Sequence, residues 1–196
     1  MPCAFNLSAI DGPELPNFGR EGYAPTDLDW IHKDRDRDAD VHLRVFRAPE
    51  GGPRWNHWSI DWRVGSSTEG PMKAGQSAIR KLEIQQDPGH MHLTNWGPRT
   101  GMVDAMTAAA QDAFFLGRLS LAQRKKLECI AAEEPVRVPD GAWNCQQWLK
   151  NVLEKAVEAD LLEEDTVTQA IDSAATVPNY KVSKAEHDAG NSRYIM

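Results

Sequence analysis

The sequence predicts an α+β fold, because strand-like alternation dominates the first part of the chain and helical periodicity the second. Residues 41–47 and 55–64 alternate apolar with polar side chains. From residue 120 onward, apolar side chains instead recur at every third or fourth position. We therefore expect an antiparallel sheet of about four to six strands, packed against two or three C-terminal helices.

Five segments have the composition of strands. We expect the first at 41–47 and, after a Pro- and Gly-rich turn, the second at 55–64. Alternation in the second segment places Trp58, Ile60 and Trp62 on one face, and His57, Ser59, Asp61 and Arg63 on the other. Residues 79–86 and 91–95 predict a third and a fourth strand, and 113–119 a fifth.

Three helices are expected in the second half. Ser120 and Gln123 have the spacing of a capping box, which predicts that a helix begins there. A longer helix is expected from residue 143 or 144 to about residue 160, because seven apolar side chains form one stripe along it: Cys145, Trp148, Leu149, Val152, Leu153, Ala156 and Val157. A third helix is expected at 163–174.

These elements predict a single folded domain between an irregular N-terminal segment and a polar C-terminal tail. Residues 1–40 are rich in Pro, Gly and Asp and predict an irregular N-terminal lead-in. Residues 41–175 predict one α+β domain, and residues 176–196 a polar C-terminal tail.

Composition argues against several classes of function. The formal net charge is -7, and no cluster of Lys and Arg would attract a phosphate backbone, so we expect no nucleic-acid partner. No apolar run approaches the roughly 18 residues that span a bilayer, so we expect no membrane partner. The three cysteines form no disulfide framework, and the first residues lack the pattern of a secretory signal. A reducing, cytoplasmic location is therefore expected.

Cys145 is the strongest candidate for chemistry. It lies in the first turn of the longer predicted helix, where unpaired amides and the helix dipole stabilise a thiolate. Cysteines at this position serve as nucleophiles when a histidine acts as base. Cys145 also lies on the apolar stripe, where a cysteine is often simply a small core residue. Both interpretations are open at this point.

Histidines on the predicted strands can supply the base. His57 lies on the polar face of the second strand, and alternation places His90 and His92 on one face of the fourth. We expect Cys145, His57 and His92 to form a catalytic group, although each histidine alone has the composition of an ordinary surface residue. A metal site of these histidines and Cys145 is an alternative, but the residues match no recognisable ligand spacing. We therefore expect no metal and no cofactor.

Aromatic and amide side chains flank these candidates. We expect Trp58, Trp96, Trp143, Asn144 and Gln146 to contact a small-molecule or peptide substrate, with Asn144, Gln146 or the Cys145 amide as oxyanion donors. The alternative for the tryptophans is that they pack in the core, because each ring buries a large area.

The order of these motifs resembles the circularly permuted papain-like proteins of the lecithin-retinol acyltransferase type, and also a family of small fungal proteins. The matching segments are 55–58, 91–94, 116–119 and 145–148, and the resemblance covers roughly residues 40–165. It implies a permuted papain-like fold in which Cys145 is the nucleophile, His57 the base and His92 the group that orients the imidazole.

The resemblance also implies a reaction class. A thiol enzyme of this kind acts on an amide, ester or thioester, by hydrolysis, acyl transfer or cyclisation, with fungal secondary metabolism as one setting. Two departures weaken it: Ile60-Asp61-Trp62 replaces the aromatic-x-Gly pattern of the acyltransferases, and residues 65–90 are longer than the usual hairpin. The competing hypothesis is a non-catalytic ligand- or protein-binding module on the same scaffold.

Overall fold

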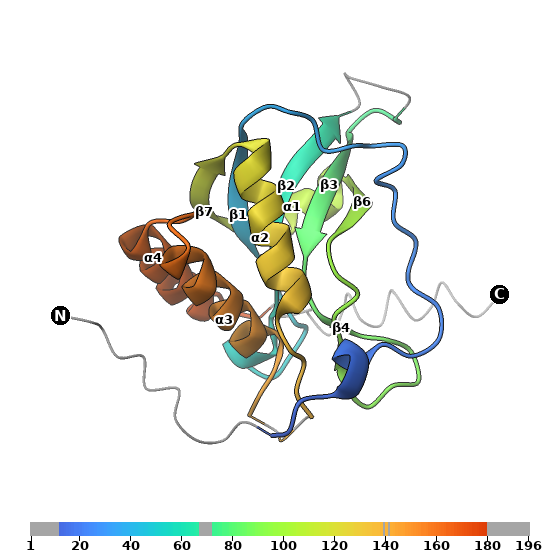
Figure 1. The fold of residues 1–196 in the computed structure, drawn as a ribbon, viewed down its shortest axis with the longest axis vertical. Helices are drawn as coiled ribbons and strands as arrows, with labels where there is room; N and C mark the ends of the chain where they lie inside the picture. The colour runs from blue at the N-terminus through green and yellow to red at the C-terminus, as the bar shows by residue number, and fades with distance from the viewer. Residues whose placement is uncertain (1–11, 67–71, 139, 141, 180–196) are drawn as a thin grey trace, which may run out of the picture.

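The computed structural model describes residues 12–66, 72–138, 140 and 142–179. These form an α+β fold, as the sequence predicts: a five-stranded antiparallel sheet packed against C-terminal helices (Figure 1). The strands of this sheet are β1 (Ala39–Phe46), β2 (His57–Ser66), β3 (Gln76–Leu82), β6 (Arg99–Asp104) and β7 (Gln111–Leu119). The longer helices are α2 (Leu121–Glu133), α3 (Cys145–Glu158) and α4 (Glu164–Ala175).

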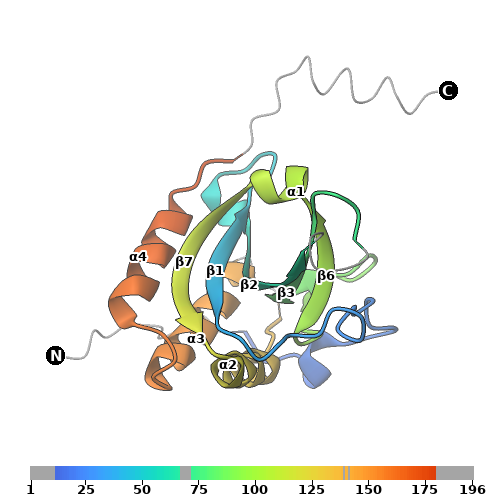
Figure 2. The same ribbon diagram turned by 90° about the horizontal axis from the view of Figure 1, so that it is seen from above.

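The sheet is strongly curved. Its strands lie in the order β6-β3-β2-β1-β7, and each neighbouring pair is antiparallel. Seen from above, β6 and β7 face each other across the open side of the curve, where the short helix α1 (Ala105–Ala109) connects them (Figure 2). Helices α2, α3 and α4 lie outside the curve (Figure 2). The sheet therefore has a convex face covered by helices and a concave face that is not.

Alternation along the strands separates the two faces chemically. Trp58, Ile60 and Trp62 of β2 are buried in the core, together with the apolar residues of β1, Val41, Leu43 and Val45. Helix α3 contributes the buried side chains Trp148, Leu149, Val152, Leu153 and Ala156 to the same core. The other β2 row, which begins at His57, faces the concave side, as the alternation predicts.

Several expected strands differ in the structure. The expected strand at 79–86 divides into β3 and β4 (Gln85–Gln86), and the one at 91–95 is reduced to β5 (Leu93–Thr94). Strands β4 and β5 pair with each other in a separate two-stranded sheet. The fourth strand of the main sheet is instead β6, which the sequence does not predict because Gly101 interrupts a weakly alternating segment.

The helix boundaries agree closely with the sequence. The capping box of Ser120 and Gln123 is present, with both reciprocal hydrogen bonds, at the start of α2. Helix α3 begins at Cys145 with Asn144 as its N-cap, and α4 follows at Glu164. No helix in the described part of the chain is long and apolar enough to cross a membrane.

The described part of the N-terminal lead-in is irregular but attached to the domain. Residues 12–38 contain a single 3-10 turn, η1 (Pro16–Gly19), and an isolated bridge between Glu14 and Arg137. Backbone hydrogen bonds join Leu15 to Val136 and Asn95 to Phe18. This segment therefore runs along the domain as a strap, a name we use below for residues 12–38.

Candidate active site

The first turn of α3 positions Cys145. The Asn144 side chain accepts hydrogen bonds from the backbone amides of Gln146, at 2.9 Å, and Gln147, at 3.3 Å. This cap fixes the helix start, so Cys145 is the first helical residue and lies at the positive end of the helix dipole. The side chain is half-buried and packs against the edge of the core.

His57, the first residue of β2, joins this thiol to a carboxylate. Its Nε2 lies 3.0 Å from Oε2 of Glu83, and its ring also hydrogen-bonds the Cys145 side chain. The bond to Glu83 occupies Nε2, which leaves Nδ1 for the sulfur. The structure thus places a thiol, an imidazole and a carboxylate in one hydrogen-bonded series, Cys145–His57–Glu83.

The electrostatics favour a charged pair at this position. Burial opposes the imidazolium, but the hydrogen bonds to Cys145 and Glu83 outweigh it and raise the pKa of His57 to about 10. Burial also opposes the thiolate, but the hydrogen bond to His57, the imidazolium charge and the backbone amides of Trp58 and Cys145 lower the pKa of Cys145. These interactions favour the thiolate–imidazolium form of the pair over the neutral thiol and imidazole.

Glu83 is held as a carboxylate by its surroundings. Burial would raise its pKa, but the hydrogen bond to His57 and the charges of Lys81, His57 and Arg99 lower it to about 2. Arg99 Nη2 lies 3.4 Å from Glu83 Oε1. Leu82, the last residue of β3, pairs with Ile60 on the core face. Glu83 follows it and so turns to the concave face that His57 occupies.

The third residue beside the imidazole is therefore Glu83, and the expectation that His92 contacts His57 is corrected. His92 lies just before β5, and its ring approaches Glu21 and His90 instead of His57. The physical reason is the pairing of the strands: β5 pairs with β4 in the small sheet, whereas β3 and β1 flank β2 in the main sheet. Alternation alone could not reveal this.

The amide side chains of Gln146 and Asn144, near the thiol, form hydrogen bonds that stabilise the local fold. Gln146 donates both of its amide hydrogen bonds to backbone carbonyls, to Pro53 at 3.0 Å and to Asn56 at 2.8 Å. Asn144 caps the helix and donates to Arg54 O at 3.3 Å. These bonds hold the chain before β2 against the start of α3. Both amide hydrogens of Gln146 are used in them, which corrects the expectation that this side chain is an oxyanion donor, whereas the expectation for Asn144 stays a prediction. The backbone amides of Cys145 and Trp58, which both point at the sulfur, remain as donors.

Two of the three tryptophans predicted to contact substrate are core residues. Trp58 is fully buried, and Trp143 is also part of the hydrophobic core. Trp96 donates from Nε1 to Asp87 Oδ2 at 2.7 Å, beside the β4–β5 hairpin. The core interpretation therefore holds for Trp58 and Trp143, because the apolar row of β2 and the end of the 135–143 connection both pack under the helices.

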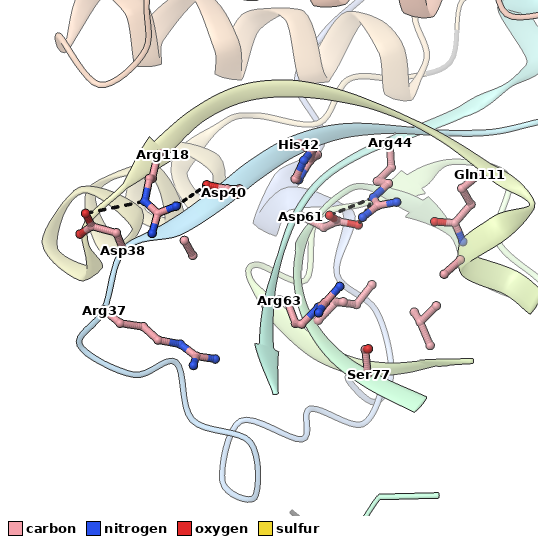
Figure 3. Close-up of a pocket in the computed structure, with 14 residues that line it drawn as sticks. Arg37, Asp38, Asp40, His42, Arg44, Asp61, Arg63, Ser77, Gln111 and Arg118 are labelled. Atoms are coloured by element: carbon pink, nitrogen blue, oxygen red, sulfur yellow. Dashed lines mark hydrogen bonds and ion pairs between the residues drawn. The ribbon is translucent and has the colours of Figure 1, made fainter. Parts of the chain in front are cut away.

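A polar chamber occupies the concave face of the sheet (Figure 3). Its volume is about 490 Å³, within the range of small-molecule sites, and charged and polar side chains point into it: His42, Arg44, Asp61, Arg63, Gln111 and Arg118. Arg44 Nε lies 3.0 Å from Asp61 Oδ2, and Arg118 pairs with Asp38 and Asp40. No pattern in the sequence predicts this chamber, because the chamber depends on the curvature of the whole sheet.

The chamber and the His57 imidazole are separated along strands β1 and β2. Asp61 pairs with His42 across β1 and β2, whereas His57 pairs with Phe46 four residues along the same strands. The Phe46 ring contacts His57 at 5.7 Å between centroids, and Lys81 Nζ lies 5.3 Å from the same ring. Phe46 and Lys81 thus lie between the His57 imidazole and the nearest polar groups of the chamber.

Metal-ligating residues gather elsewhere. Within residues 12–66, 72–138, 140 and 142–179, one group brings three such side chains close enough to share an ion, namely Glu21, His90 and His92. Neither Cys145 nor His57 belongs to it. The four-residue metal alternative raised by the sequence, with Cys145 and His57 as ligands, is therefore not assembled.

Comparisons with known proteins give no functional assignment, so an assignment depends on the geometry described above. No protein-family model, curated protein or solved structure matches the chain.

Proposed function

We propose that this protein is a papain-like thiol enzyme, of the circularly permuted type, that transfers the acyl group of an amide, ester or thioester through Cys145. The observation that carries the proposal is the hydrogen-bonded series Cys145–His57–Glu83, with a capped helix start on one side of the imidazole and a buried carboxylate on the other. A core cysteine would need neither a histidine partner nor a lowered pKa.

The groups present account for a complete cycle. The Cys145 thiolate attacks the carbonyl carbon, and the negative charge moves to the carbonyl oxygen, where the backbone amides of Cys145 and Trp58 are the nearest donors. The bond to the leaving group then breaks, and that group takes the proton from the His57 imidazolium. Neutral His57 next takes a proton from water or another nucleophile, which attacks the thioester and releases Cys145.

Glu83 acts through His57 in this scheme. Its carboxylate holds the ring in one orientation and stabilises the imidazolium, so Nδ1 remains directed at the sulfur. We therefore treat Glu83 as a positioning residue, and Cys145 and His57 as the catalytic residues.

The proposal is tested by alkylation of a single thiol. Iodoacetamide labelling is followed across pH in a Cys3→Ser/Cys129→Ser background, because Cys129 is exposed and would also react. We expect the rate to reach half its maximum well below the ordinary thiol pKa of 9.0. His57→Ala should move the midpoint upward, so that labelling near pH 7 falls by about tenfold for each unit of the shift.

A second measurement tests acyl transfer itself. The same background is incubated with p-nitrophenyl acetate, and intact-protein mass spectrometry is expected to find one acetyl group on Cys145. His57→Ala should slow its formation and Cys145→Ser should abolish it. Slow labelling that needs denaturant, together with no acetyl adduct, would instead indicate a non-catalytic binding module and would refute the enzyme proposal.

A further inference from the structure

Three metal-ligating side chains converge at the junction of the strap and the β4–β5 hairpin. The ligand atoms of Glu21, His90 and His92 all lie within 4.8 Å of one another. His90 Nε2 lies 3.9 Å from Glu21 Oε2, and His92 Nε2 lies 3.8 Å from Glu21 Oε1. The two imidazole rings are 5.2 Å apart between centroids. We propose that these residues form a binding site for one Zn²⁺ ion or a similar late first-row divalent cation.

The spacing is close to what such an ion requires. Ligands bound to Zn²⁺ at 2.0–2.1 Å in a tetrahedron are about 3.3 Å apart. The two measured nitrogen–oxygen distances exceed this by about half an ångström. The Glu21 side chain is 69% exposed, so a small rotation can close the gap without disturbing the core. Three protein ligands leave a fourth position for water.

The two histidines are prepared to bind. His92 Nδ1 lies 3.1 Å from the Leu93 carbonyl, which can only accept a hydrogen bond, so Nδ1 carries the proton in the neutral ring. The Nε2 lone pair is then free and directed toward Glu21, the arrangement found in metal-ligating histidines. The backbone of His90 is held in a turn by its own bond to Asp87 and by the Gln86 side chain.

The third ligand is brought to them by the strap. Arg20 Nε donates to Asn95 O at 2.6 Å, and Thr94 Oγ1 donates to Gly19 O at 3.2 Å, so the residues just before Glu21 are fixed on β5. Gly19 permits this approach, because a Cβ there would lie 2.7 Å from Leu93 O and 3.1 Å from His92 Nδ1. These contacts involve none of the three ligands' metal-binding atoms, so the site is assembled independently of an ion.

The ligand set also indicates which cations bind. Two imidazoles and one carboxylate suit Zn²⁺, Ni²⁺, Co²⁺ and Cu²⁺, whereas Mg²⁺ and Ca²⁺ prefer sites built entirely from oxygen. A bound ion would connect the strap to the hairpin, two segments that lie about 70 residues apart in the sequence.

The test is an isothermal calorimetric titration of tag-free, metal-stripped protein with Zn²⁺ near neutral pH. The protein carries Cys145→Ser, so that the thiol beside His57 cannot bind the ion. We expect one ion per chain, no heat from Mg²⁺ and a higher thermal midpoint in the presence of Zn²⁺. His90→Ala, His92→Ala and Glu21→Gln should each weaken binding by about tenfold or more.

Two controls make the result decisive. His42→Ala removes a histidine on the concave face and should leave Zn²⁺ affinity unchanged. Glu21→Gln changes an exposed side chain, so a loss of binding in this variant cannot be attributed to misfolding. Absence of a one-to-one Zn²⁺ complex, or a complex that persists in all three ligand variants, would overturn the proposal. Because the thiol is absent throughout, this result is independent of the proposed acyl transfer.

Discussion

At the scale of single residues, Glu83 controls the charge on the imidazole. It is a buried carboxylate with a pKa of about 2, so it stays ionised at all physiological pH values and stabilises the proton on His57. Arg99 and Lys81 add positive charge that keeps Glu83 ionised. The thiolate of Cys145 therefore depends on a residue that does not contact it.

Glu83→Gln should lower the pKa of His57. The amide keeps the shape and one hydrogen bond but removes the charge, so the imidazolium loses part of its stabilisation. We expect the His57 pKa to fall from about 10 toward the ordinary value of 6.5, as measured by NMR titration of the ring. Glu133→Gln, on the last turn of α2, is the matched control and should leave it unchanged. An unaltered His57 titration in Glu83→Gln would contradict the positioning role.

The two helix caps allow the stability of a helix to be separated from the reactivity of the thiol. Asn144→Ala removes the cap of α3 and Ser120→Ala the cap of α2, and each should lower the free energy of unfolding by about 1 kcal/mol in urea denaturation. Only Asn144→Ala should also slow Cys145 alkylation, because it alone loosens the helix start on which Cys145 lies. Equal labelling rates in the two variants would show that the α3 cap has no role at the thiol.

The candidate residues differ in how far the sequence reveals them. Cys145 can be found because the cap residue Asn144 and the apolar periodicity are local signals, and His57 because alternation assigns its face. Glu83 could not be found in this way, since its position beside His57 depends on the register between β2 and β3, which pairs Ile60 with Leu82. Glu21, the partner of His92 in the proposed metal site, lies in the lead-in and carries no periodic signal.

At the scale of elements, a buried arginine joins the strap to α2. The Arg124 side chain is fully buried and forms a two-bond ion pair with Asp34, at 2.7 and 3.0 Å. It also donates to the backbone carbonyls of Arg35, Arg37 and Leu119. The Arg124 guanidinium thus makes five hydrogen bonds that attach the strap and the end of β7 to α2, and Trp62 Nε1 of β2 also donates to Asp34, at 2.9 Å.

Arg124→Met should be strongly destabilising. It leaves the Asp34 carboxylate buried without its counter-charge, a change that costs about 3–5 kcal/mol. Guanidinium chloride denaturation should show this loss, and Asp34→Asn in the same chain should restore part of it, because the uncompensated charge is then removed. A double variant as unstable as the sum of the two single variants would show that the two groups are not coupled.

Periodicity predicts the elements better than their pairing. The helices begin within a residue or two of their expected positions, because caps and apolar stripes lie within each segment. The sheet is less predictable: the expected strand at 91–95 belongs to a hairpin, and β6 takes its place beside β3. The pairing of strands is determined by contacts between residues that are far apart in the sequence. The pattern within a single strand therefore does not predict its partner.

At the scale of the whole molecule, the curved sheet separates a packed face from a charged one. The convex face and the helices form one continuous core, whereas the concave face holds the chamber and the row that begins at His57. Within the chamber, burial raises the pKa of Asp61 against the opposing charge of Arg44. Burial and Arg44 lower the pKa of His42, so that imidazole is neutral near pH 7. Curvature of this kind arises from the assembled sheet, and no segment of the sequence predicts it.

The pH dependence of stability should reveal the charged pair. A histidine whose pKa is raised by folding stabilises the native state fully below its unfolded pKa, near 6.5, and this contribution is lost as pH rises through about 10. The difference in thermal midpoint between the wild type and His57→Ala should therefore shrink between pH 6 and pH 10. A difference that grows with pH over this interval would indicate that folding lowers the His57 pKa.

Along the sequence, His57 precedes the connection between α2 and α3, and Cys145 follows it. One cut in this connection would therefore distribute the proposed catalytic residues over two polypeptides. The N-terminal piece would carry the whole main sheet with His57 and Glu83, and the C-terminal piece would carry α3 and α4 with Cys145. Neither piece alone could ionise the thiol in the way described. Co-expressed as separate chains, the two should regain fast alkylation of Cys145 near pH 7 only when they reassociate, which would make the protein a reporter of fragment complementation.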